Sequence, residues 1–226
     1  MKYENVVPAV FLSRPNRFIA VVSLDGEEKV VHVKNTGRCR ELLIPGRQVW
    51  LSGSSDPRRR TAYDLIAVKK REDLLVNIDS QAPNRVVREW LDGGGFGLIR
   101  PEYSFGDSRI DFYMESGDRR FLLEVKGCTL EADGVGYFPD APTVRGVRHL
   151  RELVRARRDG MEAAVAFVIQ MEGVYKVRPN VATHPEFGAA LEEAAGAGVR
   201  ILYLPCRVAP DELEVTGASA RDVFGL

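Results

Sequence analysis

Two acids and a lysine in the middle of the chain have the residue types and the spacing of a catalytic set. Asp111 lies in the segment Ser108–Tyr113, and Glu124 and Lys126 lie in Phe121–Lys126 with one apolar residue between them. Both segments alternate polar and apolar residues, which predicts β-strands whose two faces differ. Such a set suits metal-assisted hydrolysis, in which carboxylates hold a cation and a base positions a water molecule.

The alternation also predicts which side chains share a face. In the first strand, Asp111 is expected opposite a set of apolar side chains at every second residue: Ile110, Phe112 and Met114. In the second strand, Glu124 and Lys126 are expected opposite a similar apolar set: Phe121, Leu123 and Val125. The three candidate side chains therefore project away from the apolar faces of their strands.

The connection between the two strands sets their register. It contains Gly117-Asp118, a dipeptide typical of a tight hairpin turn. If these two residues form the loop, Ser116 pairs with Arg119, and Asp111 lies directly across from Glu124. Opposed residues have Cβ atoms about 5 Å apart, and two carboxylates so placed repel by roughly 3 kcal/mol at an effective dielectric of about 20. The pair therefore needs a cation, a shared proton or a nearby base.

A divalent metal ion is the cation that these residue types favour, and carboxylate oxygens suit Mg²⁺ or Mn²⁺. Lys126 shares a face with Glu124, where its ammonium group would hold the attacking water or offset charge on a phosphate. The same register places Arg109 opposite Lys126, so one of the two must turn away or meet an anion. The alternative is an exposed hairpin on which Glu124 and Lys126 are simply solvated, because a Glu-x-Lys triplet is common.

The residues around this hairpin predict an α/β arrangement. Apolar residues at helical spacing predict a helix that begins near residue 83 and ends at Gly93-Gly94-Gly95; they are Val86, Val87, Trp90 and Leu91. A strand is expected at about Arg100–Ser104, before the hairpin. The elements expected after it are a helix over Thr143–Arg158, a buried strand over Ala163–Gln170, a helix over Pro185–Ala195 and a buried strand over Val199–Leu204.

The pattern of roughly the first eighty residues predicts short strands separated by turns such as Asp25-Gly26 and Pro45-Gly46. Five strands in this length suggest a small barrel, for which the oligonucleotide-binding (OB) type is one candidate and a sandwich-like fold an alternative. The expected strands are Arg17–Leu24, Lys29–Lys34, Gln48–Ser52, Ala62–Lys69 and Leu74–Asp79. We therefore expect two domains, residues 1–82 and residues 83–226.

The composition, 45% hydrophobic and 28% charged, is that of an ordinary soluble globular protein. No apolar run is long enough for a membrane span, and the first residues lack a secretory signal pattern. Cys39, Cys128 and Cys206 are few and far apart, which suits a reducing cytoplasm and gives no zinc spacing. We predict a cytoplasmic protein without a membrane partner, and a homodimer is compatible with these data.

The net charge of zero hides an asymmetry. Residues 1–82 hold 14 Lys and Arg against 10 Asp and Glu, a balance of +4, and the remaining residues hold 18 against 22, a balance of −4. A basic first half favours an anionic partner such as nucleic acid. The candidate phosphate-binding side chains are Arg38, Arg40, Arg58, Arg59 and Arg60 in this half, and Arg148, Arg151 and Arg155 on one side of the helix over residues 143–158. Solvated surface charge is the alternative for each group.

Several runs of residues resemble the sugar fermentation stimulation protein A family of prokaryotes, in order and along nearly the whole chain. They include Asn35-Thr36-Gly37, Asn84-Arg85, Ser108–Phe112, Glu124-Val125-Lys126, Thr129-Leu130, Gly136–Ala141 and His149–Leu153. The resemblance implies an amino-terminal OB-like barrel joined to a domain of the PD-(D/E)xK nuclease fold, in a family described as DNA-binding with a proposed link to maltose metabolism. It maps the nuclease motif to Asp111, Glu124 and Lys126, although residue 110 is Ile where the motif's name has Pro. Glu89, on the preceding helix, is the candidate for an additional acid.

We therefore predict an α/β protein with a five-stranded OB-like barrel and a restriction-endonuclease-like domain. It would bind DNA with little sequence preference and hydrolyse phosphodiesters using Mg²⁺ or Mn²⁺ held by Asp111, Glu124 and the Val125 carbonyl. Lys126 would position or activate the water. The main alternative is a non-enzymatic DNA-binding regulator linked to sugar metabolism. An enzyme of sugar metabolism is disfavoured, because no phosphate-binding glycine loop occurs in a suitable context.

Overall fold

A computed structural model describes residues 1–35, 37–56 and 58–226 of the chain. The amino-terminal part is a sheet of six strands in the order β3-β2-β1-β4-β5-β6, and an additional pairing of β3 with β5 closes it. The strands are β1 (Val6–Ser13), β2 (Ile19–Leu24), β3 (Glu27–Val33), β4 (Gln48–Gly53), β5 (Tyr63–Arg71) and β6 (Leu74–Asn77). The closed part has five strands, so the predicted five-stranded OB-like barrel is confirmed.

The five strands of the barrel are not quite the five that the sequence predicts. The first is β1, whose run of apolar residues interrupted by Pro8 shows no alternation and therefore gave no strand signal. Ala9 and Phe11 of this strand are nevertheless buried inside the barrel. The last predicted strand corresponds to β6, which pairs with β5 outside the closed ring and leads toward the second half of the chain.

The second half of the chain is built on a six-stranded sheet in the order β15-β14-β12-β9-β8-β7, with β9, β12 and β14 parallel. The strands are β7 (Leu98–Phe105), β8 (Ser108–Ser116), β9 (Arg119–Cys128), β12 (Glu162–Ile169), β14 (Arg200–Ala209) and β15 (Glu212–Val215). The helices are α1 (Ala82–Asp92), α2 (Val144–Arg158), α3 (Pro185–Gly196) and α4 (Ala220–Phe224). The predicted α/β arrangement is confirmed.

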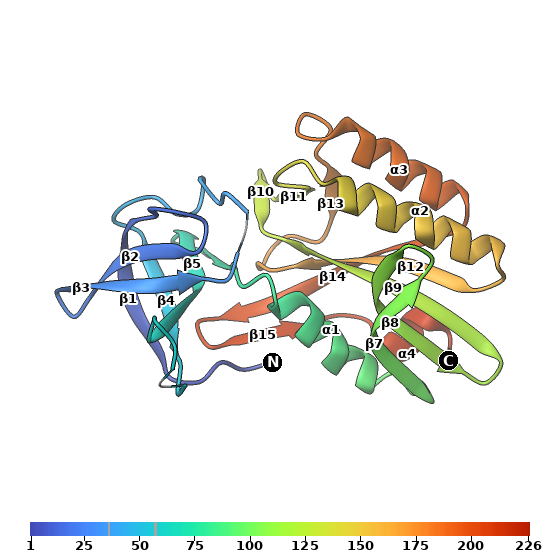
Figure 1. The fold of residues 1–226 in the computed structure, drawn as a ribbon, viewed down its shortest axis with the longest axis horizontal. Coiled ribbons are helices and arrows are strands. Elements are labelled where there is room, and N and C mark those ends of the chain that lie inside the picture. The colour runs from blue at the N-terminus through green and yellow to red at the C-terminus, as the bar shows by residue number, and fades with distance from the viewer. Residues whose placement is uncertain (36, 57) are drawn as a thin grey trace.

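The helices lie on both faces of this sheet (Figure 1). One core joins α2 and α3 to the sheet through side chains such as Leu150 and Phe187, and the other joins α1 and α4 to it through Val87 and Phe224. Thr143 caps α2 as its position suggests, because its hydroxyl accepts the Gly146 N–H at 3.0 Å. Elements that the sequence did not predict are β15, α4 and a small sheet of β10 (Leu130–Ala132), β11 (Val135–Phe138) and β13 (Val177–Pro179).

The barrel and the α/β part share one apolar core. The cluster that contains the barrel residues Val33 and Leu65 also contains Val76 and Ile78 after the barrel, and Ile169 and Met171 at the end of β12. Gln170 Nε2 donates to the backbone carbonyls of Asn77 and Asp79, both at 3.1 Å. Among the described residues, no helix is long and apolar enough to cross a membrane.

An ion-pair cluster also connects the barrel to the small sheet. The buried carboxylate of Glu131, in β10, accepts hydrogen bonds from Lys70 and Arg71 of β5 and from the Gly134 N–H. Burial alone would raise the pKa of Glu131, but the hydrogen bonds from Lys70, Gly134 and Arg71 lower it from 4.5 to about 2. The charged carboxylate therefore stabilises this connection at neutral pH.

Replacing Glu131 with Gln should lower the free energy of unfolding at pH 7 by up to about 3 kcal/mol. A depressed pKa in the folded state contributes stability above the unfolded value of 4.5, and this contribution is lost as the pH falls toward 2. The difference between wild type and Glu131→Gln in urea unfolding should therefore shrink between pH 5 and pH 3. A constant difference across this range would show that the carboxylate charge is not what stabilises the connection.

Candidate metal centre and nucleic-acid surface

The hairpin of β8 and β9 has the predicted register. Ser116 pairs with Arg119, and the pairs continue in step to Phe112 opposite Leu123. The next pair would be Asp111 and Glu124, and here the ladder ends because the Asp111 carboxylate takes the place of a strand hydrogen bond. The two acids therefore lie at the point where the two strands separate.

One detail of the predicted faces is wrong. Phe112 and Met114 pack in the core that includes α1, as the alternation predicts, whereas Ile110 packs in the core that includes α2. The neighbouring strand β7 explains this change of face. Glu102 lies opposite Asp111 and has a left-handed φ of 53°, which bends the β7–β8 ribbon at this position.

Asp111 is held between α1 and β9. Its Oδ1 accepts a hydrogen bond from Asn84 Nδ2 at 2.7 Å, and its Oδ2 accepts the Val125 N–H at 2.7 Å. Burial raises the pKa of Asp111, and the charge of Glu124 raises it further, against the opposing effects of the Val125 N–H, Lys126 and Asn84. A cation beside Asp111 would relieve both effects that raise its pKa.

Glu124 is 1% exposed, and its two carboxylate oxygens have different surroundings. Oε1 accepts hydrogen bonds from Lys126 Nζ and His149 Nδ1. Oε2 is buried and has no hydrogen-bond partner among the described residues. Burial by itself would raise the pKa of Glu124, but the Lys126 charge and the His149 hydrogen bond bring it below its usual value. The result is a charged carboxylate with one unsatisfied oxygen.

His149 is a site residue that the sequence analysis did not identify. It is 2% exposed on the buried side of α2, next to Leu150. Arg145 Nε donates to His149 Nε2 at 3.2 Å, so the proton on the ring is left on Nδ1, where Glu124 accepts it. The sequence does show a polar residue within the apolar stripe of a helix at this position. Such a residue does not indicate which side chain it contacts.

These residues fit a divalent cation with oxygen ligands. The buried, unpartnered Glu124 Oε2 requires a partner, and the Asp111 carboxylate is nearby on the adjoining strand. In the part of the chain that the structure describes, no three His, Cys, Asp or Glu side chains are gathered for a metal ion. Any ion at Asp111 and Glu124 would therefore complete its shell with the Val125 carbonyl, water or a phosphate, as Mg²⁺ commonly does.

Two other predicted neighbours of the site have defined positions. Glu89 lines the same groove of about 500 Å³ as Asp111, and its Oε2 pairs with the amino group of Met1 at 2.7 Å. Arg109, expected opposite Lys126, turns away and pairs with Glu102 at 2.9 Å. The expected conflict between two basic side chains is thereby avoided, and Lys126 stays with Glu124.

The predicted arginines of the barrel fall into two sets. Arg38 and Arg40 are exposed along a groove of about 310 Å³ that also contains Arg14 and Arg17. Arg14 organises this groove, because it donates to the backbone carbonyls of four residues: Arg17, Asn35, Gly37 and Arg38.

The second set lies on another loop, where Arg58 pairs with Asp56 and Arg59 with Asp64, while Arg60 is exposed. On α2, Arg148, Arg151 and Arg155 are exposed, and Arg155 lies over the Phe105 ring at 5.9 Å. The other groove thus gathers four arginines, Arg14, Arg17, Arg38 and Arg40, around one concave surface of the described barrel. We call it the arginine groove.

The chain has a closed OB-like barrel joined to an α/β domain. In that domain two acids and a lysine lie where a pair of strands separates. These features define a class of two-domain proteins with a restriction-endonuclease-like second domain. Residues 12–78 match the family model described as the SfsA N-terminal OB domain, and residues 81–212 match the sugar fermentation stimulation protein RE domain. The chain belongs to the sugar fermentation stimulation protein (SfsA) family, so the predicted family is confirmed.

Relatives and a solved structure cover nearly the whole chain. The sugar fermentation stimulation protein homolog of Desulfitobacterium hafniense (strain DSM 10664 / DCB-2) is 54% identical over 217 residues, which are 95% of each chain. The homolog of Clostridium beijerinckii is 48% identical over 219 residues, covering 95% of this chain and 96% of that one. The structure of Pyrococcus furiosus SfsA in complex with Ca²⁺ is 28% identical, covers 96% of both chains and superposes with a TM-score of 0.85.

Proposed function

We propose that this protein is a metal-dependent phosphodiesterase that acts on nucleic acid, with DNA as the first substrate to test. The observation that carries the proposal is the buried Glu124 carboxylate, whose Oε2 has no partner among the described residues while Asp111 faces the same strand opening. The complex of the P. furiosus relative with Ca²⁺ supports a divalent cation in this fold. Residues 83–226 would carry the hydrolysis, and the barrel of residues 1–82 would hold the nucleic acid.

Asp111, Glu124 and the Val125 carbonyl would hold Mg²⁺ or Mn²⁺, which when bound activates water and neutralises charge on a phosphate. His149 fixes the Glu124 carboxylate through Oε1 and so leaves Oε2 free for the metal. Asn84 and the Val125 N–H fix Asp111 in the same way. The Lys126 side chain is 13% exposed, and its ammonium group would orient the attacking water or stabilise charge on the phosphate oxygens.

The direct test is cleavage of labelled single-stranded, duplex and branched DNA with Mn²⁺, with Mg²⁺ and with a chelator. We expect cleavage that requires the metal and is abolished in Glu124→Gln, which keeps the size of the side chain but removes its charge. If no substrate is cut and Mn²⁺ does not raise the melting temperature, the protein is a non-enzymatic nucleic-acid-binding regulator instead.

Nucleic-acid binding should depend on the arginine groove more than on the Arg58–Arg60 loop. Replacing both Arg38 and Arg40 with Ala should weaken binding about equally for unrelated sequences, because phosphate contacts carry no sequence information. The slope of log affinity against log salt should become shallower by about 1.4 on single strands if each arginine contacts one phosphate. Fluorescence anisotropy at several salt concentrations measures both effects.

The matched control is the double variant Arg58→Ala and Arg60→Ala, which removes the same charge from the neighbouring loop. Its affinity and slope should change less, because Arg58 is already paired with Asp56. If the Arg58 and Arg60 double variant lost more affinity than the Arg38 and Arg40 double variant, the binding surface would lie on the Arg58–Arg60 loop. An unchanged affinity in both would favour the exposed arginines of α2.

A further inference from the structure

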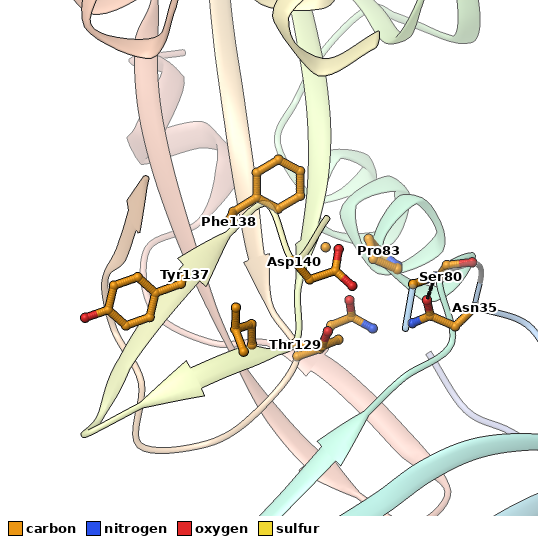
Figure 2. A pocket seen from close by; sticks show the side chains of 11 residues that line it. Asn35, Ser80, Pro83, Thr129, Tyr137, Phe138 and Asp140 are labelled. Carbon is orange, nitrogen blue, oxygen red and sulfur yellow. Dashed lines mark hydrogen bonds between the residues drawn. The ribbon is translucent and has the colours of Figure 1, made fainter. Parts of the chain in front are cut away.

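A second concave site lies where the barrel meets the α/β domain (Figure 2). This junction pocket has a volume of about 160 Å³. Its walls come from Asn35 and Gly37 of the barrel, from Ser80 and Pro83, from the end of β9 with Thr129, from the segment Tyr137–Asp140, and from Gln170. Much of this lining lies in runs that carry the family resemblance, yet the proposed hydrolysis uses none of these side chains.

Gln170 contributes an acceptor to the lining of the pocket. The residue is 1% exposed, and its Nε2 donates to three acceptors: the Asn77 carbonyl, Asn77 Oδ1 and the Asp79 carbonyl. These bonds fix the orientation of the amide, so Oε1 points away from them, and it has no hydrogen-bond partner among the described residues. An ideal Cβ atom built on Gly127 would collide with this oxygen, which locates it directly beside Gly127.

Asp140, an exposed residue, supplies a second acceptor to the same pocket. Its carboxylate forms no hydrogen bond or ion pair within the described ranges, and Figure 2 shows it pointing into the space between Thr129 and Asn35. A Cβ atom on Gly37 would collide with Asp140 Oδ2 and lie 2.8 Å from Asn35 Oδ1. Gly37 and Gly127 therefore leave room for the two acceptors because neither has a side chain.

Two side-chain donors of the pocket are already used. Asn35 Nδ2 donates to the Ile78 carbonyl, and Ser80 donates its hydroxyl to the Lys34 carbonyl. The site thus presents a carboxylate and an amide oxygen beside the Thr129 hydroxyl, flanked by the apolar side chains of Pro83, Leu130 and Phe138. Such a lining selects a flat group that offers N–H donors at its edge.

The volume limits the size of that group. A water molecule needs about 10–15 Å³ by this measure, so 160 Å³ holds on the order of ten water-sized atoms. Guanine has about eleven non-hydrogen atoms by composition, whereas drug-sized ligands need roughly 300 Å³ or more. The volume therefore suits one nucleobase better than a whole nucleotide.

The position of the pocket connects it with the two sites described above. Gly37 lines both the junction pocket and the arginine groove. On the other side, Gly127 follows Lys126 and Pro83 precedes Asn84, the partner of Asp111. A strand whose phosphates lie in the arginine groove would therefore pass the junction pocket before it reaches the metal centre.

We infer that the junction pocket binds a single unpaired guanine base of a nucleic-acid strand, with Asp140 and Gln170 Oε1 accepting hydrogen bonds from its Watson–Crick edge. Guanine offers the N1–H and the 2-amino group side by side, which matches the two oxygens of a carboxylate, whereas adenine, cytosine and thymine each have an acceptor next to their edge donor. The inference rests on the proposed function for its substrate class. It concerns binding alone and requires no metal ion.

The test measures binding of fluorescent oligothymidylates that carry one central dG, dI, dA, dC or dT, in the presence of a chelator. Wild type should bind the dG strand roughly 5- to 150-fold more tightly than the all-dT strand. The dI strand, whose base lacks the 2-amino group, should lose much of this gain. Asp140→Asn should abolish the preference for dG and leave the affinity for all-dT unchanged, whereas Asp133→Asn, at the exposed turn between β10 and β11, should keep the preference.

Gly37→Ala provides a second variant, because its backbone does not need a left-handed conformation and its methyl group would fill the space beside Asp140. It too should remove the preference for dG.

Equal affinity of wild type for all five strands, a preference for another base, or a preference that survives in Asp140→Asn would each overturn the inference. The inference would also be overturned if wild type showed no base preference and Asp140→Asn bound one Mn²⁺ fewer than wild type. The pocket would then be a cation site. Cleavage of all-dT strands with Mn²⁺ tests the proposed hydrolysis separately, since it does not depend on this pocket.

Discussion

Replacing Lys126 with Ala should abolish metal-dependent cleavage, with a loss of at least a hundredfold to a thousandfold in rate, while the fold and metal binding are kept. The size of the loss is that expected when one group that stabilises developing charge, or orients the nucleophile, is removed. Lys126 is assigned to the water and the phosphate and not to the metal, so Mn²⁺ should still raise the melting temperature of this variant. Initial cleavage rates and thermal melts with and without Mn²⁺ measure the two effects.

Glu124→Ala should differ from Lys126→Ala in its response to Mn²⁺. It removes a proposed metal ligand, so both cleavage and the rise in melting temperature with Mn²⁺ should vanish. Without metal this variant should be less stable than wild type, because Glu124 is the partner of both Lys126 and His149, which would be left unpaired. We expect the loss of these two contacts to outweigh the relief of repulsion from Asp111.

Lys176→Ala is the matched control, because it removes an exposed lysine of the same domain at a distance in sequence from the site. Its cleavage rate and its response to Mn²⁺ should equal those of wild type. If Lys126→Ala loses the metal response as well, the lysine helps to hold the metal site together, and its assignment to the water is wrong.

The second large effect is expected at His149. Replacing it with Leu removes one of the two side-chain donors to the buried Glu124 Oε1 and should lower the free energy of unfolding by about 2–4 kcal/mol. The freed carboxylate would lose its fixed orientation, so the affinity for Mn²⁺ should fall by about 10- to 100-fold, as for other residues that orient a metal ligand. Urea unfolding and a titration with Mn²⁺ measure the two losses.

His149→Asn tests whether the hydrogen bond or the bulk of the ring matters, because its side-chain NH₂ replaces the donor at Nδ1. It should recover part of the metal affinity that His149→Leu loses. His32→Asn is the control, since His32 pairs with Asp64 in the barrel at 3.0 Å, far in sequence from the metal centre. It should leave the Mn²⁺ affinity unchanged. Equal Mn²⁺ affinity in wild type and His149→Leu would refute the positioning role.

The parts of the site that lie within one hairpin were predictable from sequence. Gly117-Asp118 fixes the loop, and the loop fixes every later pair, so the meeting of Asp111 and Glu124 at one strand opening follows from local rules. The fold class was predictable for a similar reason, because the long helices and buried strands of the second half have strong periodicity.

The parts built by distant segments were not predictable. His149 reaches Glu124 across 25 residues, and nothing in the helix pattern indicates which carboxylate it meets. Asn84 reaches Asp111 from another helix, and the bend at Glu102 that turns Ile110 to the other face depends on a backbone conformation with no sequence signature. The junction pocket combines loops from both domains, so each of its residues reads as an ordinary turn or strand end when taken alone.

The apolar core that continues from the barrel into the α/β domain fixes the distance between the two domains. A barrel on a flexible tether would sample many separations from the metal centre and would give products of many lengths. Because the barrel residues Val33 and Leu65 belong to the same cluster as Ile169 and Met171, the barrel is held at a fixed distance from the α/β domain. A strand held by the barrel would be cut at a constant number of nucleotides from the point where it is gripped, and the spacing of the products would report the geometry of the junction.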